Sequence, residues 1–192
     1  ASDRTPVLSP PQNYFPVLPF GAGADGLPQW IPVASNNPLD GGHAGITRAL
    51  VIIHDTSRDA NAALGTIAGL AGTENATTMI VAPQFLQDTD ITRFASALPE
   101  HGKNIVRWPL DGWVFGGESI ASTSQKPISS YTTMDLLLLY LGDTKTFPDL
   151  QHVIVTGHGA GADFVQRYAA VGQAPDLLAE DKKTVRFVMA NA

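Results

Sequence analysis

The segment from Gly157 to Gly161 carries the residue types and spacing that most clearly predict chemistry. It reads Gly-His-Gly-Ala-Gly, directly after the apolar run 152–156 and directly before a helical pattern at 162–171. One site built on such a turn is the nucleophile elbow, G-x-S-x-G, whose small flanking residues allow a sharp bend that presents the central side chain above a sheet. Gly157 and Gly161 match the ends of that motif, and Gly159 stands where the attacking serine would be.

The same residues also satisfy a dinucleotide-binding fingerprint, G-x-G-x-x-[GA]. Gly157, Gly159 and Ala162 have its spacing, and in that motif the helix N-terminus holds a pyrophosphate. The fingerprint also needs an acidic residue at the end of the following strand, to bind a ribose hydroxyl. The strand expected at 185–189 is followed by Ala-Asn-Ala instead. A nucleotide-binding oxidoreductase therefore remains the weaker alternative.

The elements that must position this turn alternate between two periodicities. Continuous apolar runs predict buried strands, and 3.6-residue spacing that ends at glycine predicts helices. The expected strands are 49–54, 78–82, 152–156 and 185–189, and the expected helices are 62–70, 134–141 with Ser129 or Ser130 as its cap, and 162–171. This alternation predicts an α/β fold: a mostly parallel sheet with helices on both faces.

Length and composition predict one domain and exclude several partners. The 192 residues suit a single domain, with an irregular N-terminal segment at 1–40 and a core at 49–192. The short apolar pieces at 14–20 and 29–34 predict short strands or irregular edge structure. A net charge of −6 without a Lys/Arg cluster argues against nucleic acid. The longest apolar run, 136–141, is too short to cross a membrane. There is no cysteine, and no histidine spacing resembles a metal site, so we expect no metal and no cofactor.

Taken together, these segments resemble secreted or periplasmic proteins of the α/β-hydrolase fold. The resemblance rests on the loop His54-Asp55-Thr56-Ser57-Arg58 after a strand, a later loop with Trp113 and paired glycines, and the Gly157–Gly161 elbow. It implies a serine hydrolase that acts on a small-molecule ester or amide. It also implies that the loop after the third strand, which in the family often begins with His-Gly, lends a backbone amide to the oxyanion hole.

The sequence departs from the family pattern at three places. Asp55 stands where glycine is usual, and we expect this to be tolerated because an oxyanion hole uses main-chain N–H groups. Gly159 offers no oxygen nucleophile, so serine acyl transfer cannot occur as the sequence stands. The C-terminal strands that bring the acid and histidine of a triad are absent from this chain. We expect a second polypeptide, produced by cleavage in the loop after 185–189, to supply them.

The resemblance assigns roles to six residues. Gly159 takes the nucleophile position, and the oxyanion hole would use the N–H groups of Ala160 and Thr56. Arg58, Trp113 and His158 are candidates for contacts with substrate, although a structural ion pair for Arg58 and simple packing for Trp113 and His158 are competing interpretations.

Two functional hypotheses follow besides the oxidoreductase. The first is an ester or amide hydrolase disabled by substitution of its serine. The second is a natural pseudoenzyme that binds a small ligand in the former active-site cleft. The first residue is alanine, and Asn75-Ala76-Thr77 is a glycosylation triplet. Both features favour a protein that has lost a leader and is secreted or periplasmic.

Overall fold

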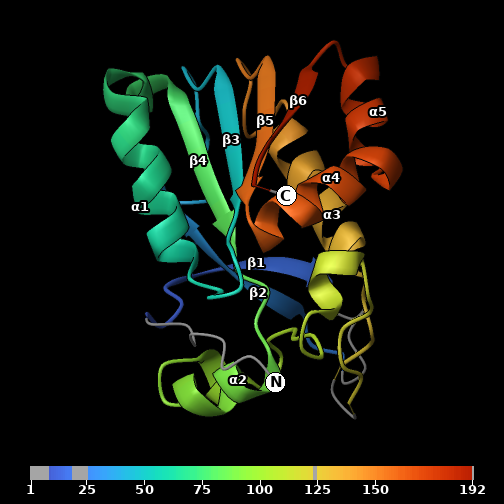
Figure 1. Cartoon of the computed structure of the whole chain (residues 1–192). Helices are drawn as coiled ribbons and strands as arrows, with labels where there is room; N and C mark the ends of the chain where they lie inside the picture. Colours follow the sequence, from blue (N-terminus) through green and yellow to red (C-terminus); the bar gives the residue numbers. More distant parts are fainter. Residues whose placement is uncertain (1–8, 19–25, 123–124, 192) are drawn as a thin grey trace.

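The computed structural model describes residues 9–18, 26–122 and 125–191, and a six-stranded sheet forms its centre (Figure 1). The strand order is β1-β2-β4-β3-β5-β6. The strands are β1 (Asn13–Leu18), β2 (Gln29–Ser35), β3 (Arg48–Ile53), β4 (Thr78–Pro83), β5 (His152–His158) and β6 (Thr184–Ala190). The last four are mutually parallel, whereas β2 pairs antiparallel with both β1 and β4.

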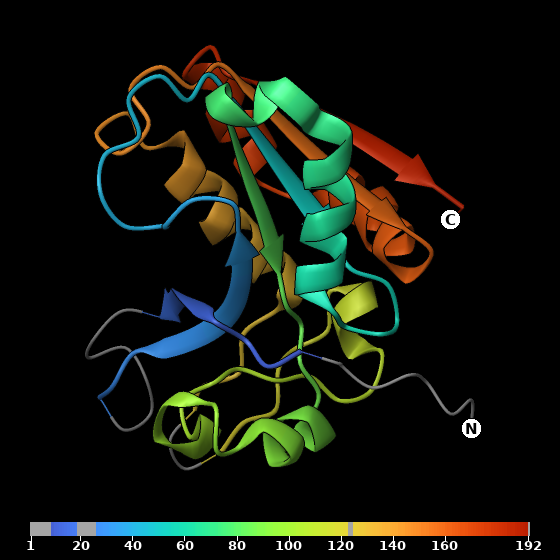
Figure 2. The same cartoon turned by 90° about the vertical axis from the view of Figure 1, so that its left-hand side faces the viewer.

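Helices cover both faces of this sheet. They are α1 (Ala60–Ala71), α2 (Asp88–Phe94), α3 (Ser130–Gly142), α4 (Ala160–Val171) and α5 (Ala174–Glu180), with 3-10 turns η1 (Gly72–Thr77), η2 (Pro99–Gly102) and η3 (Gly112–Phe115). Figure 1 shows α1 on one side of the strands and α3, α4 and α5 on the other, and Figure 2 shows α2 below the sheet. None of the described helices is long and apolar enough to cross a membrane.

The two faces explain why the central strands are apolar at almost every position. Ala49, Val51 and Ile53 of β3 join the main core cluster, which also holds residues of α3 and α4. Leu50 and Ile52 point the other way and pack with Ala60 and other residues of α1. Because side chains alternate along a strand, a strand covered on both sides must be apolar throughout.

This architecture confirms the fold class expected from the sequence. It is an α/β-hydrolase fold: the elbow joins β5 to α4, and the loop after the adjacent strand β3 lies beside it. The seven expected elements of the core are all present.

The N-terminal and connecting segments add elements to those expected in the core. Within 1–40, the apolar pieces at 14–20 and 29–34 fall on β1 and β2, so they form short strands of the sheet; positions 1–8 and 19–25 lie outside the described residues. Helices α2 and α5 were not predicted, since each has only seven residues. Such short elements are decided by caps and tertiary contacts rather than by periodicity.

Helix starts differ in how their first amides are satisfied. Asp59 caps α1 by accepting from the N–H of Ala62, and Ser129, one of the two expected caps, does so for α3 by accepting from Tyr131. The N-cap position of α4 is Gly159, which has no side chain to offer. Its first amides therefore need an acceptor from elsewhere in the fold.

Candidate functional site

The turn between β5 and α4 has the backbone geometry of an elbow. Gly159 has φ 56° and ψ −125°, a combination that residues with a side chain rarely adopt. An added Cβ at Gly157 would lie 2.3 Å from the carbonyl carbon of Gly161, and one at Gly161 would lie 2.3 Å from the carbonyl oxygen of Ile53. The flanking glycines are therefore required by close backbone approach, as the motif predicts.

The space in front of Gly159 is occupied by Asp55. Its Oδ1 accepts a hydrogen bond from the N–H of Ala160 at 2.9 Å. An added Cβ at Gly159 would lie 2.7 Å from that same Oδ1 and 2.9 Å from Cγ. The expectation that Asp55 would leave an oxyanion hole unaffected is therefore wrong, because the carboxylate itself sits on one of the two proposed donors.

Thr56, the second proposed donor, lies in a tight turn after β3. The N–H of Arg58 donates to the carbonyl of Asp55 at 2.9 Å and closes that turn. Thr56 and Ala160 line the same pocket, and the N–H of Thr56 has no acceptor among the described residues. The structure thus brings the two candidate amides to one pocket, with one of them already engaged.

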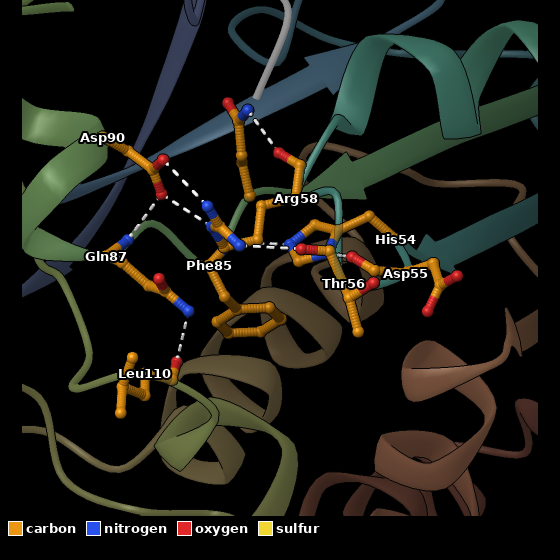
Figure 3. Close-up of polar contacts among 9 residues, drawn as sticks. His54, Asp55, Thr56, Arg58, Phe85, Gln87, Asp90 and Leu110 are labelled. Carbon is orange, nitrogen blue, oxygen red and sulfur yellow. Dashed lines mark hydrogen bonds and ion pairs between the residues drawn. The ribbon is translucent and has the colours of Figure 1, made fainter. Parts of the chain in front are cut away.

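Arg58 does not line this pocket, and its guanidinium turns toward Asp90, away from the Asp55 side chain (Figure 3). It is 4% exposed, and its guanidinium makes two contacts with the Asp90 carboxylate, 2.7 Å from Nε to Oδ2 and 3.0 Å from Nη2 to Oδ1. Nη1 donates to the carbonyl of Thr56 at 2.7 Å. The guanidinium is thus committed to a buried ion pair that shapes the loop. This geometry favours the structural interpretation of Arg58 over a substrate contact.

His54 is a second buried anchor of the same loop. Its Nδ1 lies 2.9 Å from the carbonyl of Asp55, and its Nε2 accepts from the N–H of Phe85 at 2.9 Å, so the neutral ring donates through Nδ1. Burial is the main cause that lowers the pKa of His54 to about 4. The imidazole is neutral at neutral pH and fully hydrogen-bonded, which argues for a structural role.

Trp113 and His158 also lie outside the pocket lining. Trp113 is 1% exposed and stacks on Phe85 with ring centroids 5.4 Å apart, so packing describes it better than a pocket wall. His158 is exposed at the end of β5, where its Nε2 accepts from Nδ2 of Asn191 at 2.8 Å. Neither residue is among those that line the pocket above Gly159.

The elbow opens into a pocket of about 320 Å³. It is lined by Thr56, Asp111, Val114, Phe115, Gly159, Ala160, Asp163 and Asn191. Phe115 is 61% exposed, and the guanidinium of Arg167 lies 4.8 Å from its ring centroid. The pocket therefore combines an aromatic wall with carboxylates and an amide, a mixture suited to a small polar molecule.

Most of these lining residues were not predicted from the sequence. Asp163 follows the elbow by one helical turn, a spacing that could have indicated it. Val114 and Phe115 adjoin Trp113, so the predicted loop was correct while the residue that faces the pocket was not. Asp111 and Asn191 carry no local signal, because they arrive through the loop before η3 and the end of β6.

A larger cavity, of about 510 Å³, lies elsewhere, against β1 and β2, with Tyr14, Trp30 and Tyr140 in its lining. We place the candidate site at the elbow despite its smaller volume, because the strained backbone of Gly159 meets the first turn of α4 there. Among the described residues, no group of three or more His, Cys, Asp or Glu side chains could hold a metal ion.

Comparison with known proteins finds similarity in structure but not in sequence. No family model matches this sequence, and no curated protein matches it significantly. LpqC, a poly(3-hydroxybutyrate) depolymerase from Bordetella parapertussis, aligns at a TM-score of 0.49 and 18% identity, over 85% of this chain and 48% of its own. Poly(aspartic acid) hydrolase-1 from Sphingomonas sp. KT-1 aligns at 0.48 and 16%, over 84% and 51%. This chain thus spans about half the length of these solved structures, and neither likeness bears on what it binds or cleaves.

Proposed function

We propose that this protein binds a small ester- or amide-type molecule in the elbow pocket and, as its sequence stands, does not cleave it by serine acyl transfer. One observation carries the proposal: Gly159 has the strained backbone of a nucleophile position and no side-chain oxygen. An elbow holds such a conformation to present an attacking atom. Here the conformation remains and the attacking atom is missing.

The pocket above the elbow supports a ligand of modest size. Its volume of about 320 Å³ is at the lower end of the range for small-molecule sites. Phe115 offers an exposed ring, and Asn191 and Thr56 offer hydrogen-bonding groups. A neutral ester or amide, with an apolar part and a carbonyl, matches these contacts better than a charged polymer does.

The dinucleotide alternative has less support at the same turn. A pyrophosphate would need the N–H groups at the start of α4, but the Asp55 carboxylate already accepts from Ala160. Like charge would oppose a phosphate there. Furthermore, the end of β6 reads Val188-Met189-Ala190 and continues into Asn191, so these positions offer no carboxylate to a ribose hydroxyl.

Binding is tested with substitutions in and beside the pocket. Short-chain esters and matching amides are titrated against the protein and followed by calorimetry. Phe115→Ala should weaken binding roughly fivefold, because a ring that covers the ligand contributes about 1 kcal/mol. Leu110→Ala is the matched control, since Leu110 is an exposed apolar residue of the same loop, 77% exposed, that does not line the pocket. Equal effects of the two substitutions, or no binding at all, would contradict the proposal.

Absence of acyl transfer is tested separately. The unmodified protein should show no stoichiometric labelling by a fluorophosphonate and no multiple turnover of 4-nitrophenyl acetate. Covalent labelling of the folded protein at any single serine would contradict it. The codon at position 159 then distinguishes the two origins, because a natural pseudoenzyme encodes glycine in its gene and a replaced serine does not.

The second polypeptide and the secreted or periplasmic location stay predictions. Val188 and Met189 on β6 are apolar and 52% and 43% exposed, so they are residues that a docked partner could cover. Native mass spectrometry of the purified protein tests the idea, since a companion fragment should be released only on denaturation.

A glycan at Asn75, which the Asn75-Ala76-Thr77 triplet predicts, would compete with an existing contact. The Nδ2 of Asn75 donates a hydrogen bond to the carbonyl of Ala68 at 3.0 Å.

A further inference from the structure

We infer that Asp55 and Gly159 form a matched pair, in which the Asp55 carboxylate blocks the elbow's own oxyanion-binding amide and excludes any side chain at position 159. The inference deepens the proposed function and rests on it in one respect, the interpretation of Gly159 as the nucleophile position of an elbow. It explains two departures from the hydrolase pattern, at positions 55 and 159, by one contact rather than two independent losses.

The first half of the pair is electrostatic. The Ala160 N–H belongs to the first turn of α4, where the helix dipole favours negative charge and where Gly159 supplies no capping oxygen. Asp55 Oδ1 lies 2.9 Å from this nitrogen, which is the place and distance of an oxyanion in acyl transfer. The carboxylate is therefore an internal stand-in for that oxyanion, held by a charge-assisted hydrogen bond.

The second half of the pair is steric. The three elbow glycines differ in whether an added Cβ would meet backbone atoms or the Asp55 side chain. Added Cβ atoms at Gly157 and Gly161 would collide with backbone atoms, so those positions need glycine whatever residue 55 is. At Gly159 the nearest atoms are all from Asp55, with Oδ1 at 2.7 Å, Cγ at 2.9 Å and Oδ2 at 3.1 Å. The carboxylate must shift to admit a Cβ, and the shift lengthens or breaks its hydrogen bond to Ala160. A side chain at 159 and the present Asp55 contact therefore compete for the same space.

The pair has a functional consequence for anything that enters the pocket. A ligand oxygen can reach the Ala160 amide only by displacing the Asp55 carboxylate. Because the loop after β3 holds this carboxylate beside the amide, its effective concentration there is high. Removing the carboxylate should open the amide to an external anion. Restoring a serine alone should not rebuild an oxyanion hole, because Asp55 would still compete for the same donor.

The pairing is tested by a double-mutant cycle in urea unfolding. Gly159→Ala adds only a Cβ, and its backbone strain is common to both backgrounds and cancels in the cycle. We expect the substitution to lower the folding equilibrium constant about fivefold more with Asp at position 55 than in the Asp55→Ala background. Asp55→Asn keeps the size and removes the charge, so it should retain the steric part. Equal effects of Gly159→Ala in all three backgrounds would overturn the pairing.

A second measurement needs no change at position 159. Acetate, a small carboxylate probe, is titrated into the protein while the Ala160 amide is followed by NMR. In the Asp55→Ala variant the amide should shift with acetate, and the unmodified protein should need at least tenfold more acetate for the same shift. An identical response in both proteins would overturn the block. Neither experiment uses the ester or amide ligand, so the pair and the proposed function can fail independently.

Discussion

Two regions flank the loop after β3, and they hold it in opposite ways. Behind the loop, His54, Arg58 and Asp90 are between 1% and 4% exposed. An ion pair joins Arg58 to Asp90, and His54 is hydrogen-bonded to the backbone of Asp55 and Phe85. In front of it, Asp55 is exposed, and within the part of the chain that the structure describes its one side-chain hydrogen bond is accepted from Ala160. The buried residues behind the loop, which we call the rear, fix its backbone path. Asp55, the front, determines whether another group can bind the Ala160 amide.

The difference shows that stability and site chemistry are separable here. A buried charged pair is strongly destabilising when one partner is removed, because the other charge remains without compensation. An exposed carboxylate on a helix terminus contributes far less. Substitutions behind the loop should therefore unfold the protein, whereas substitutions in front should alter the pocket while the fold persists.

The largest expected effect comes from Asp90→Ala, which leaves the buried Arg58 without its partner. It should lower the free energy of unfolding by about 3–5 kcal/mol. The matched control is Asp88→Ala in the same helix, where Asp88 pairs with Arg107 but is 69% exposed. That pair should contribute less than about 1 kcal/mol. Similar losses in urea unfolding would remove the contrast between buried and exposed charge.

The next effect is a pH dependence that originates at His54. Burial lowers its pKa to about 4 in the folded protein, from an ordinary 6.5. As pH falls, the His54 ring becomes protonated near pH 6.5 in the unfolded chain but only near pH 4 in the folded protein. The free energy of unfolding therefore decreases as pH drops from about 6.5 to about 4. The contribution is about 3 kcal/mol. His54→Gln should remove it from the pH profile and His101→Gln should not, since His101 is exposed; parallel profiles for all three proteins would contradict the assignment.

In front of the loop, Asp55→Ala should have a moderate effect. Loss of the only cap on Ala160 should reduce stability by about 1 kcal/mol, the usual contribution of an N-terminal cap. Asp59→Ala, which removes the cap of α1, supplies a benchmark of the same kind. Asp55→Ala should also leave the secondary structure unchanged by circular dichroism. If Asp55→Ala lowered the free energy of unfolding as much as Asp90→Ala does, Asp55 would stabilise the fold as strongly as the buried ion pair, and the contrast would be lost.

The smallest effect is expected at the rim of the pocket. Asp163 and Arg167 form an exposed pair one helical turn apart, 3.3 Å between Oδ1 and Nη1. Asp163→Ala should change stability by about 0.3–0.5 kcal/mol or less. A thermal unfolding scan suffices to detect any larger change, which would show that the rim is more rigid than its exposure indicates.

The sequence predicted where the strands and the elbow lie better than it predicted the contacts of Arg58 and Asp55. Apolar runs located β3 and β5, and glycine spacing located the elbow, because both signals are local. The ion pair of Arg58 was foreseen only as an alternative, since its partner Asp90 lies 32 residues away in a helix that periodicity did not reveal. The role of Asp55 was missed for the same reason: its acceptor contact joins residues 105 positions apart.

The central claim is that the elbow's Ala160 amide is already occupied by the Asp55 carboxylate, and the chemical shift of that amide proton tests it most directly. A hydrogen bond to a carboxylate moves an amide proton downfield. The account predicts that Asp55→Ala moves the Ala160 proton upfield, while neighbouring amides of α4 beyond the first turn stay in place. An Ala160 proton with the same shift in both proteins would show that the carboxylate is not on the amide, and would contradict the account.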